Sequence, residues 1–229
     1  RSRRLRRCPR PPLPSPVRRN WVWYSLQLLG QLFFTLFFRL RARGIDKIPA
    51  DGGALFLINH QSFLDPLVVG APLSRPVSYL ARDSLFSVPV VGWILSNTYV
   101  FPISREAASP ASIKEAVRRM QHGFLVGIFP EGTRSIDGTL GEMKPGFVAL
   151  VRRGKVPVLP VGVSGSGRAF PRNSWLVRPR TVRVVFGDPF SDEEIRELTK
   201  RGREDEFIAL VRERIDALRH EAEDWIRDG

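Results

Sequence analysis

Cysteine and histidine are scarce in this sequence, and their scarcity narrows the chemistry that the chain can support. Cys8 is the only cysteine among 229 residues, which excludes an intrachain disulfide and a metal site built from several cysteines. The three histidines, His60, His122 and His220, are far apart in the sequence, so we do not expect a zinc centre.

The common glycine-rich signatures are also missing. The segment 162–167 is rich in glycine and serine, but it does not fit Gly-x-Ser-x-Gly in any register, nor a dinucleotide-binding or phosphate-loop pattern. We therefore predict a flexible loop there. Since no serine or cysteine stands out as a nucleophile, the sequence does not indicate a covalent intermediate.

Acidic side chains are too few to balance the basic ones. The chain has 36 Lys and Arg against 23 Asp and Glu, a net charge of +13. This excess implies an anionic partner, and nucleic acid, an anionic lipid surface and a phosphorylated substrate are all candidates. The apolar and charged fractions, 43% and 26%, are those of an ordinary globular protein. The length suits one domain with an appended segment.

The N-terminal part of the chain divides into two segments. Residues 1–19 contain eight arginines and five prolines, so we predict a disordered basic arm. Residues 20–43 contain an uncharged run from Trp21 to Phe38, which predicts an apolar, membrane-associating helix. Arginines follow the run where a signal peptide would have small residues.

The same run is just long enough to span a bilayer. However, Gln27, Gln31 and Thr35 recur at helical spacing and form a polar stripe along one face. We therefore expect a helix that lies in the membrane plane or is half inserted, with a span as the alternative.

Residues 44–229 alternate between strand and helix patterns, which predicts an α/β domain with a mixed, mostly parallel sheet flanked by helices. Prolines 157 and 160 restrict ladder hydrogen bonds, so we expect the segment 156–163 at a sheet edge or in an irregular strand. Ser191 begins a capping box, after which one apolar stripe continues to the C-terminus. The predicted strands are 54–59, 77–80, 99–103, 124–129, 156–163 and 181–186, and the predicted helices include 88–95, 110–122 and 146–153.

A histidine and an aspartate follow the first buried strand of this domain. His60 comes directly after the apolar run 54–58, and Asp65 lies five residues further on. Ser62 is placed to cap a short helix that brings the Asp65 carboxylate back toward the imidazole. A base held by an orienting carboxylate fits this pattern, although a purely structural hydrogen bond between the two side chains fits it as well.

A second polar segment follows another buried strand. It is Phe129-Pro130-Glu131-Gly132-Thr133-Arg134-Ser135. Gly132 permits a tight turn, Thr133 supplies a hydroxyl, and the planar guanidinium of Arg134 suits a phosphate. A surface turn with an internal ion pair is the alternative. Arg105 is a third candidate, since it also comes just after a strand.

Taken in order, these segments resemble the four blocks of the glycerolipid acyltransferase family, and most closely its bacterial 1-acyl-sn-glycerol-3-phosphate acyltransferase branch. The similarity covers roughly residues 44–190, and its first block is the His-x4-Asp motif. The blocks are Asn59-His60-x4-Asp65, Val100–Arg105, Phe129–Ser135 and Val156–Val161.

The resemblance implies a direct transfer of an acyl group from an acyl thioester, acyl-CoA or acyl-carrier protein, to the sn-2 hydroxyl of lysophosphatidic acid. In that reaction His60 is the general base and Asp65 orients it. Glu131, Gly132, Thr133 and Arg134 bind the acceptor, with Arg134 and Arg105 on its phosphate. The resemblance implies no metal and no cofactor.

The partners expected on this interpretation are an anionic membrane surface and the two substrates, without nucleic acid. The protein would lie at the cytoplasmic face of a membrane, the inner membrane in a bacterium. One alternative is the same chemistry on another acceptor, a lysophospholipid or a lyso-aminolipid. An alternative of a different class is a non-catalytic basic protein that binds membranes or nucleic acid.

Overall fold

The computed structural model describes residues 21–103, 110–172 and 174–229. Within these ranges seven strands form one sheet in the order β1-β7-β6-β2-β5-β3-β4. Every neighbouring pair is parallel except β6 and β7. The predicted mixed, mostly parallel sheet is therefore confirmed. Its strands are β1 (Arg41–Arg43), β2 (Ala54–Ile58), β3 (Val77–Arg82), β4 (Phe101–Ile103), β5 (Leu125–Ile128), β6 (Val158–Ser164) and β7 (Arg183–Phe186).

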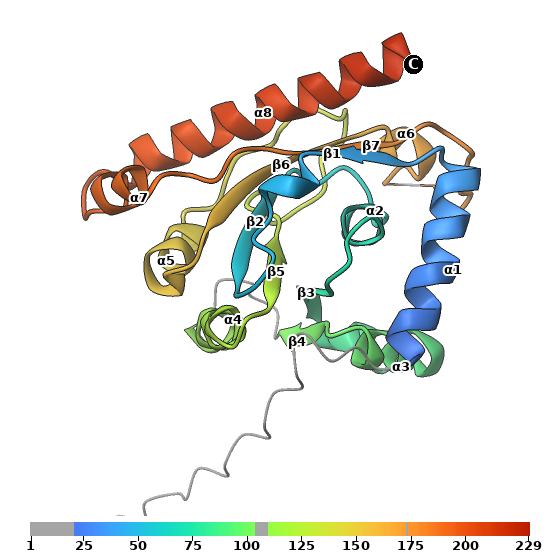
Figure 1. The fold of residues 1–229 in the computed structure, drawn as a ribbon, viewed down its shortest axis with the longest axis horizontal. Helices are drawn as coiled ribbons and strands as arrows, with labels where there is room; N and C mark the ends of the chain where they lie inside the picture. The colour runs from blue at the N-terminus through green and yellow to red at the C-terminus, as the bar shows by residue number, and fades with distance from the viewer. Residues whose placement is uncertain (1–20, 104–109, 173) are drawn as a thin grey trace, which may run out of the picture.

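Helices cover both faces of this sheet (Figure 1). Among the described residues the α-helices are α1 (Trp21–Phe37), α2 (Asp65–Gly70), α3 (Pro89–Asn97), α4 (Pro110–Gln121), α5 (Gly146–Gly154), α6 (Ser166–Ala169), α7 (Asp192–Leu198) and α8 (Glu204–Asp228). Short 3-10 turns occupy Ile45–Lys47 and Asp83–Leu85. The helices α4, α5, α7 and α8 lie on one side of the sheet, whereas α2 lies on the other side, between the sheet and α1.

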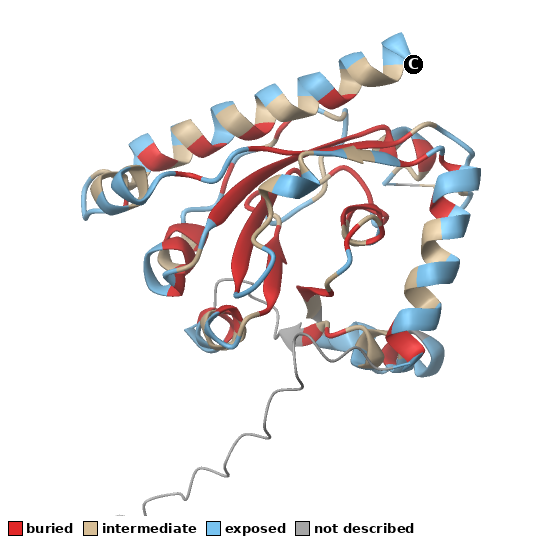
Figure 2. Ribbon diagram, viewed as in Figure 1, coloured by how far each residue is buried: buried red, intermediate tan, exposed pale blue. Residues whose placement is uncertain are grey.

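The central strand β2 is buried on both faces, as Figure 2 shows for the middle of the sheet. Its side chains alternate between the faces, so Leu55 and Leu57 join the core under α4, α5 and α8, while Phe56 and Ile58 join the core beside α2. A strand buried on both faces needs a continuous apolar sequence, which explains why this run carries no polar residue.

The C-terminal helix α8 packs along β6 and β7 through the predicted apolar stripe. Its fully buried members are Phe207, Val211, Ile215 and Ala222. Gly162 on β6 permits the contact, because a Cβ atom there would lie 2.3 Å from the backbone carbon of Leu218. The capping box at Ser191 is also confirmed, at the start of α7.

Of the two possibilities predicted for 156–163, a sheet edge or an irregular strand, the sheet edge is wrong. β6 is an interior strand, paired with β2 on one side and β7 on the other. Pro160 is tolerated because it lies in the parallel register opposite Leu57, while the ladder to β7 begins only at Val161. The proline, which has no N–H to donate, therefore lies before the residues of β6 that pair with β7.

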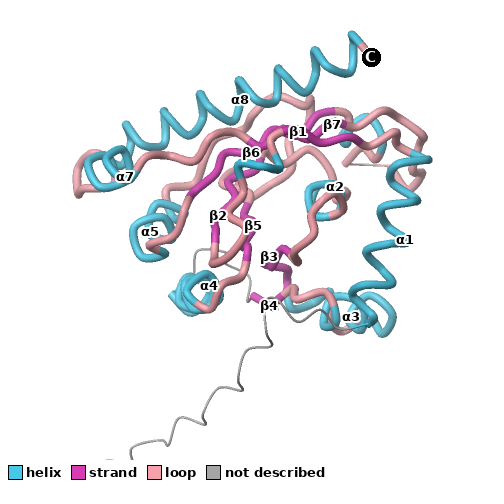
Figure 3. Tube along the Cα trace, viewed as in Figure 1, coloured by secondary structure: helices cyan, strands magenta, loops and turns pink. Residues whose placement is uncertain are grey.

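The predicted N-terminal helix is present as α1, but its boundary with the sheet domain differs from the prediction. The helix ends at Phe37, and Arg41–Arg43 form strand β1, which pairs with β7 (Figure 3). The sheet therefore begins inside the predicted segment 20–43. The predicted basic arm at 1–19 lies outside the described residues.

The two glutamines of the polar stripe on α1 face the protein, whereas Thr35 is exposed. The side-chain amide of Gln27 donates to the carbonyl oxygens of Gly70, Ala71 and Leu73, at 3.0, 2.7 and 2.9 Å. Gln31 donates to the same Ala71 oxygen at 2.8 Å. These carbonyls belong to the end of α2 and the residues after it.

An apolar face of α1 is consequently left exposed. Its exposed large side chains are Trp21, Tyr24, Leu28, Leu29, Leu32, Phe33, Leu36 and Phe37. None of the helices in the described part of the chain, α1 included, has both the length and the hydropathy to cross a bilayer.

Candidate active site

The first block of the sequence lies at the carboxyl end of β2, in the middle of the sheet (Figure 1). β5 and β6 run parallel to β2 on either side, so the segments that follow these strands meet at the same edge. Open α/β sheets place their ligands at this edge. The fold therefore brings the histidine block, the Glu-Gly-Thr-Arg block and the segment after β6 together.

His60 and Asp65 form the predicted pair. The distance from His60 Nδ1 to Asp65 Oδ2 is 2.8 Å. The Asp65 side chain is fully buried, whereas the His60 side chain is 17% exposed. We assign the proton to Nδ1, because an ionised carboxylate only accepts hydrogen bonds. Nε2 then carries a lone pair, and no residue in the described ranges bonds it.

Asp65 is surrounded by hydrogen-bond donors. The backbone N–H groups of Gln61 and Ser62 both donate to Oδ2, each at 2.7 Å. The hydroxyl of Ser166 donates to Oδ1 at 2.5 Å. Such donors stabilise the ionised carboxylate even though it is buried.

Ser62 caps the following turn only in part. Asp65 accepts from the Ser62 N–H, as in a capping box, but the Ser62 hydroxyl accepts from Leu64 at 3.3 Å and donates to the carbonyl of Phe170 at 2.8 Å. α2 begins at Asp65. The carboxylate is therefore shared between the helix start and the imidazole.

The second block holds the main chain of His60 from both sides. Glu131 Oε1 accepts from the His60 N–H at 2.7 Å, and the Ser135 N–H donates to the His60 carbonyl at 2.7 Å. The other oxygen of Glu131 accepts from the Gly141 N–H at 2.7 Å. Burial raises the pKa of Glu131, and the hydrogen bonds from His60 and Gly141 offset part of this rise. Both carboxylate oxygens are thus occupied by backbone donors, so the geometry favours a positioning role over direct contact with an acceptor.

Aromatic rings fix the plane of the imidazole. The Phe129 ring is stacked on the His60 ring, with centroids 4.0 Å apart and an interplanar angle of 22°. The Tyr79 ring in turn stacks on the Phe129 ring, with centroids 6.1 Å apart. This packing leaves the imidazole little freedom to rotate.

Gly132 and Thr133 of the second block are exposed, and Arg134 is partly exposed. Gly132, at φ 68°, forms the turn. The guanidinium carbon of Arg134 lies 3.6 Å from the centroid of the Phe63 ring. Burial and the neighbouring charge of Arg172 lower the pKa of Arg134. Arg105 lies outside the described residues.

Arg172 is a cation that the sequence analysis missed. Its Nη1 donates to the Arg134 carbonyl at 3.1 Å, and Arg134 Nη1 lies 3.5 Å from the Arg172 carbonyl. Within the described ranges the hydrogen bonds of both guanidinium groups go to main-chain carbonyls, and neither has a carboxylate partner. Two unpaired cations beside the pair of His60 and Asp65 suit an anionic ligand.

The prediction of a flexible loop at 162–167 is wrong. Residues 158–164 are strand β6, and Ser166 begins α6 with its side chain fully buried. Asn59, the first residue of the histidine block, bonds the same segment: its amide oxygen accepts from the Val163 N–H at 2.7 Å, and its amide nitrogen donates to the Val163 carbonyl at 2.9 Å. The sequence does show a serine, Ser166, just after this Gly-rich strand, but no local pattern indicates that its hydroxyl contacts Asp65.

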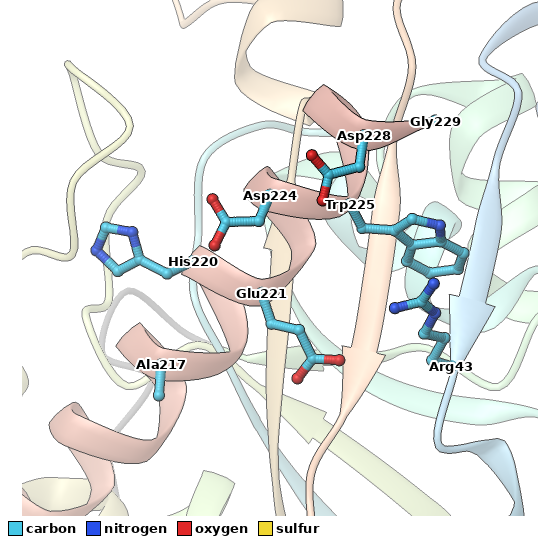
Figure 4. Close-up of a pocket in the computed structure, with 8 residues that line it drawn as sticks. All are labelled: Arg43, Ala217, His220, Glu221, Asp224, Trp225, Asp228 and Gly229. Atoms are coloured by element: carbon cyan, nitrogen blue, oxygen red, sulfur yellow. The ribbon is translucent and has the colours of Figure 1, made fainter.

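Two hollows lie away from His60 and Asp65. The one in Figure 4, of about 580 Å³, is formed by the C-terminal part of α8 and Arg43, whose guanidinium lies 3.8 Å from the Trp225 ring centroid. The other, of about 670 Å³, lies between α5 and α7. Neither contains a candidate catalytic or acceptor-binding residue, although the second is lined in part by Val156 and Pro157 of the fourth block.

The chain is similar to known acyltransferases. A family model described as Acyltransferase matches residues 39–164. The chain is 30% identical over 180 residues to the chloroplastic 1-acyl-sn-glycerol-3-phosphate acyltransferase LPAT1 of Arabidopsis thaliana, a match that covers 76% of this chain and 50% of that protein. The 1-acyl-sn-glycerol-3-phosphate acyltransferase of Bacillus subtilis (strain 168) is 28% identical over 176 residues, which is 76% of this chain and 84% of that protein.

The fold also matches a solved structure. The crystal structure of the 1-acyl-sn-glycerophosphate acyltransferase PlsC from Thermotoga maritima superposes with a TM-score of 0.72 at 24% identity, covering 87% of this chain and 79% of that chain. The chain spans about half the length of the plant relatives that it matches.

The family model covers more than half of the chain and includes the histidine block, the Glu-Gly-Thr-Arg block and strand β6. The resemblance found in the sequence is thereby confirmed, and the chain belongs to the glycerolipid acyltransferase family.

Proposed function

We propose that this protein transfers an acyl group from an acyl thioester to the sn-2 hydroxyl of 1-acyl-glycerol-3-phosphate, which gives phosphatidic acid. The observation that carries the proposal is the pair of His60 and Asp65, with the imidazole oriented by a buried carboxylate and Nε2 unbonded by the described residues. The names of the relatives support the choice of acceptor.

In the proposed reaction His60 Nε2 takes the proton of the acceptor hydroxyl as that oxygen bonds to the thioester carbonyl carbon. The carbon–sulfur bond then breaks, and the leaving thiolate takes the proton back from the imidazolium. Asp65 holds the tautomer and stabilises the imidazolium. General base catalysis contributes about 10²–10⁴-fold, and positioning of the two substrates supplies much of the rest.

Arg134 is proposed to bind the acceptor phosphate, and Arg172 joins it because each guanidinium contacts the main-chain carbonyl of the other residue and neither has a carboxylate partner in the described ranges. Arg105 and Thr133 remain proposed acceptor ligands. Gly132 gives the turn its shape. Glu131 acts on His60 through the main chain, as its two hydrogen bonds support.

The exposed apolar face of α1 is proposed to insert into the membrane surface, because both the acceptor and the product are membrane lipids. The net charge of +13 favours an anionic surface. The acyl donor is proposed to be acyl-CoA or acyl-carrier protein. The protein would then lie on the cytoplasmic side, where these donors occur.

The test is an acyl-transfer assay of the purified protein with a panel of lyso acceptors and both kinds of thioester. We expect turnover of lysophosphatidic acid, and we expect His60→Ala to reduce it by about 10²–10⁴-fold. His122→Ala is the matched control, since this exposed histidine follows α4 at the opposite end of the sheet. Turnover of headgroup-capped lipids without turnover of lysophosphatidic acid would contradict the proposed acceptor, and retained turnover in His60→Ala would contradict the proposed base.

A further inference from the structure

A buried hydroxyl from outside the four sequence blocks touches the proposed catalytic pair. Ser166 follows β6, its side chain is fully buried, and its Oγ lies 2.5 Å from Asp65 Oδ1. Since Ser166 has no surface exposed to a substrate, it is not a candidate nucleophile. Its contact with the described residues of the site runs through Asp65.

The fold holds Ser166 in place through two features of its own segment. Gly165 turns the chain at φ 89°, where a Cβ atom would lie 2.1 Å from the Thr181 carbonyl oxygen, so the turn requires glycine. Two residues earlier, Val163 is bonded through both its N–H and its carbonyl to the side chain of Asn59. Asn59 precedes His60, so the segment that presents the hydroxyl is tied to the segment that presents the imidazole.

The two oxygens of Asp65 have different partners. Oδ2 accepts from the imidazole and from two backbone N–H groups, whereas Oδ1 accepts from Ser166. The terminal torsion of an aspartate is broad and has no strong intrinsic preference. A donor on Oδ1 therefore restrains the rotation of the carboxylate and keeps Oδ2 directed at Nδ1.

We propose that Ser166 is a positioning residue of the acyl transfer: its hydroxyl fixes the plane of the Asp65 carboxylate and thereby the orientation and tautomer of His60. This inference rests on the proposed function. It assigns a role in the reaction to the segment after β6, which the four blocks do not include.

The test compares Ser166→Ala with Ser164→Ala. Ser164 is also buried, lies two residues away and hydrogen-bonds Glu223 on α8, so its removal deletes a similar hydroxyl that does not touch Asp65. Ser166→Ala removes a hydrogen bond to a charged group. We therefore expect kcat to fall by about 10- to 100-fold, with both KM values changed less than about threefold. Ser164→Ala should keep kcat near that of the unmodified protein.

A double-mutant cycle with Asp65→Ala separates positioning from general damage to the fold. If Ser166 acts through Asp65, Ser166→Ala lowers the residual activity of Asp65→Ala no further. Losses that multiply would overturn the proposal, and so would a Ser166→Ala variant that behaves like Ser164→Ala. If Ser166→Ala does not fold, Ser166→Cys takes its place, because a thiol fills the site but donates only weakly. An unchanged kcat in the folded cysteine variant would also overturn the proposal. His60→Ala in the same assay tests the proposed function independently.

Discussion

The exposed face of α1 allows the membrane contribution of this helix to be predicted in free-energy terms. Leu29, Leu32 and Leu36 are 63%, 58% and 72% exposed. Complete burial of a leucine contributes about 1.5–3 kcal/mol, so the exposed part of each contributes roughly 1–2 kcal/mol when it enters the membrane surface. For the three together even the lower value is about 3 kcal/mol, or about 100-fold in the partition between water and vesicles.

The perturbation is the triple substitution of Leu29, Leu32 and Leu36 by glutamine, which preserves helix propensity and leaves Gln27 and Gln31 in place. The assay is cosedimentation with vesicles that contain anionic lipid, at low and at moderate salt. We expect the partition coefficient between water and vesicles, measured at limiting lipid, to fall by about 100-fold. Ile45→Gln is the control, since Ile45 is 38% exposed but lies outside α1.

Circular dichroism must show the same helix content in the triple variant and in the unmodified protein. A folded triple variant that binds vesicles as tightly as the unmodified protein would refute the reasoning about α1. Binding that disappears with salt in both proteins would assign the membrane contact to the basic residues alone.

Two further predictions concern the second sequence block. Arg134→Ala should raise the acceptor KM by about 10- to 100-fold while the thioester KM stays unchanged, and Arg134→Lys should restore only part of the loss because lysine has no planar fork; equal shifts in both KM values would contradict the phosphate role. Glu131→Ala should lower the free energy of unfolding, since it leaves the buried N–H groups of His60 and Gly141 without their acceptor. Burial raises the pKa of Glu131 in the folded protein. The contribution of Glu131 to the free energy of unfolding is therefore full below the ordinary glutamate pKa, and it falls as the pH rises through the raised pKa. Urea titrations should therefore show a larger difference between the two proteins near pH 4 than near pH 7, and the opposite trend would contradict the assigned shift.

The sequence predicted the parts of the site that follow from local pattern. An apolar run that ends in His60 indicates a buried strand with a polar residue at its end, and a second run that ends before Glu131 indicates the same. Parallel strands then place both ends at one edge of the sheet, so two distant motifs could be placed together without a structure. The C-terminal stripe of α8 was equally readable from helical spacing.

Contacts between distant segments were not predictable in this way. The bond between Ser166 and Asp65 spans 101 residues, and a serine in a Gly-rich segment has the same local pattern whether it is exposed or buried. Pro160 misled for a related reason: the rule against proline in central strands assumes ladder bonds on both sides, whereas here the ladder to β7 begins one residue later. Amide side chains along α1 suit water and backbone carbonyls equally well, so the sequence did not reveal which way they point.

The contacts of Gln27 and Gln31 have a consequence for protein engineering. α2 has six residues and is about 9 Å long, with Asp65 at its start and carbonyls bonded by α1 at and just after its end. Removing α1, or exchanging it for an unrelated helix, would leave these carbonyls without their amide donors. The carbonyls lie only one short helix, α2, away from Asp65. A variant with a less apolar surface should therefore retain the inward-facing glutamines of α1 and change only its outward-facing side chains.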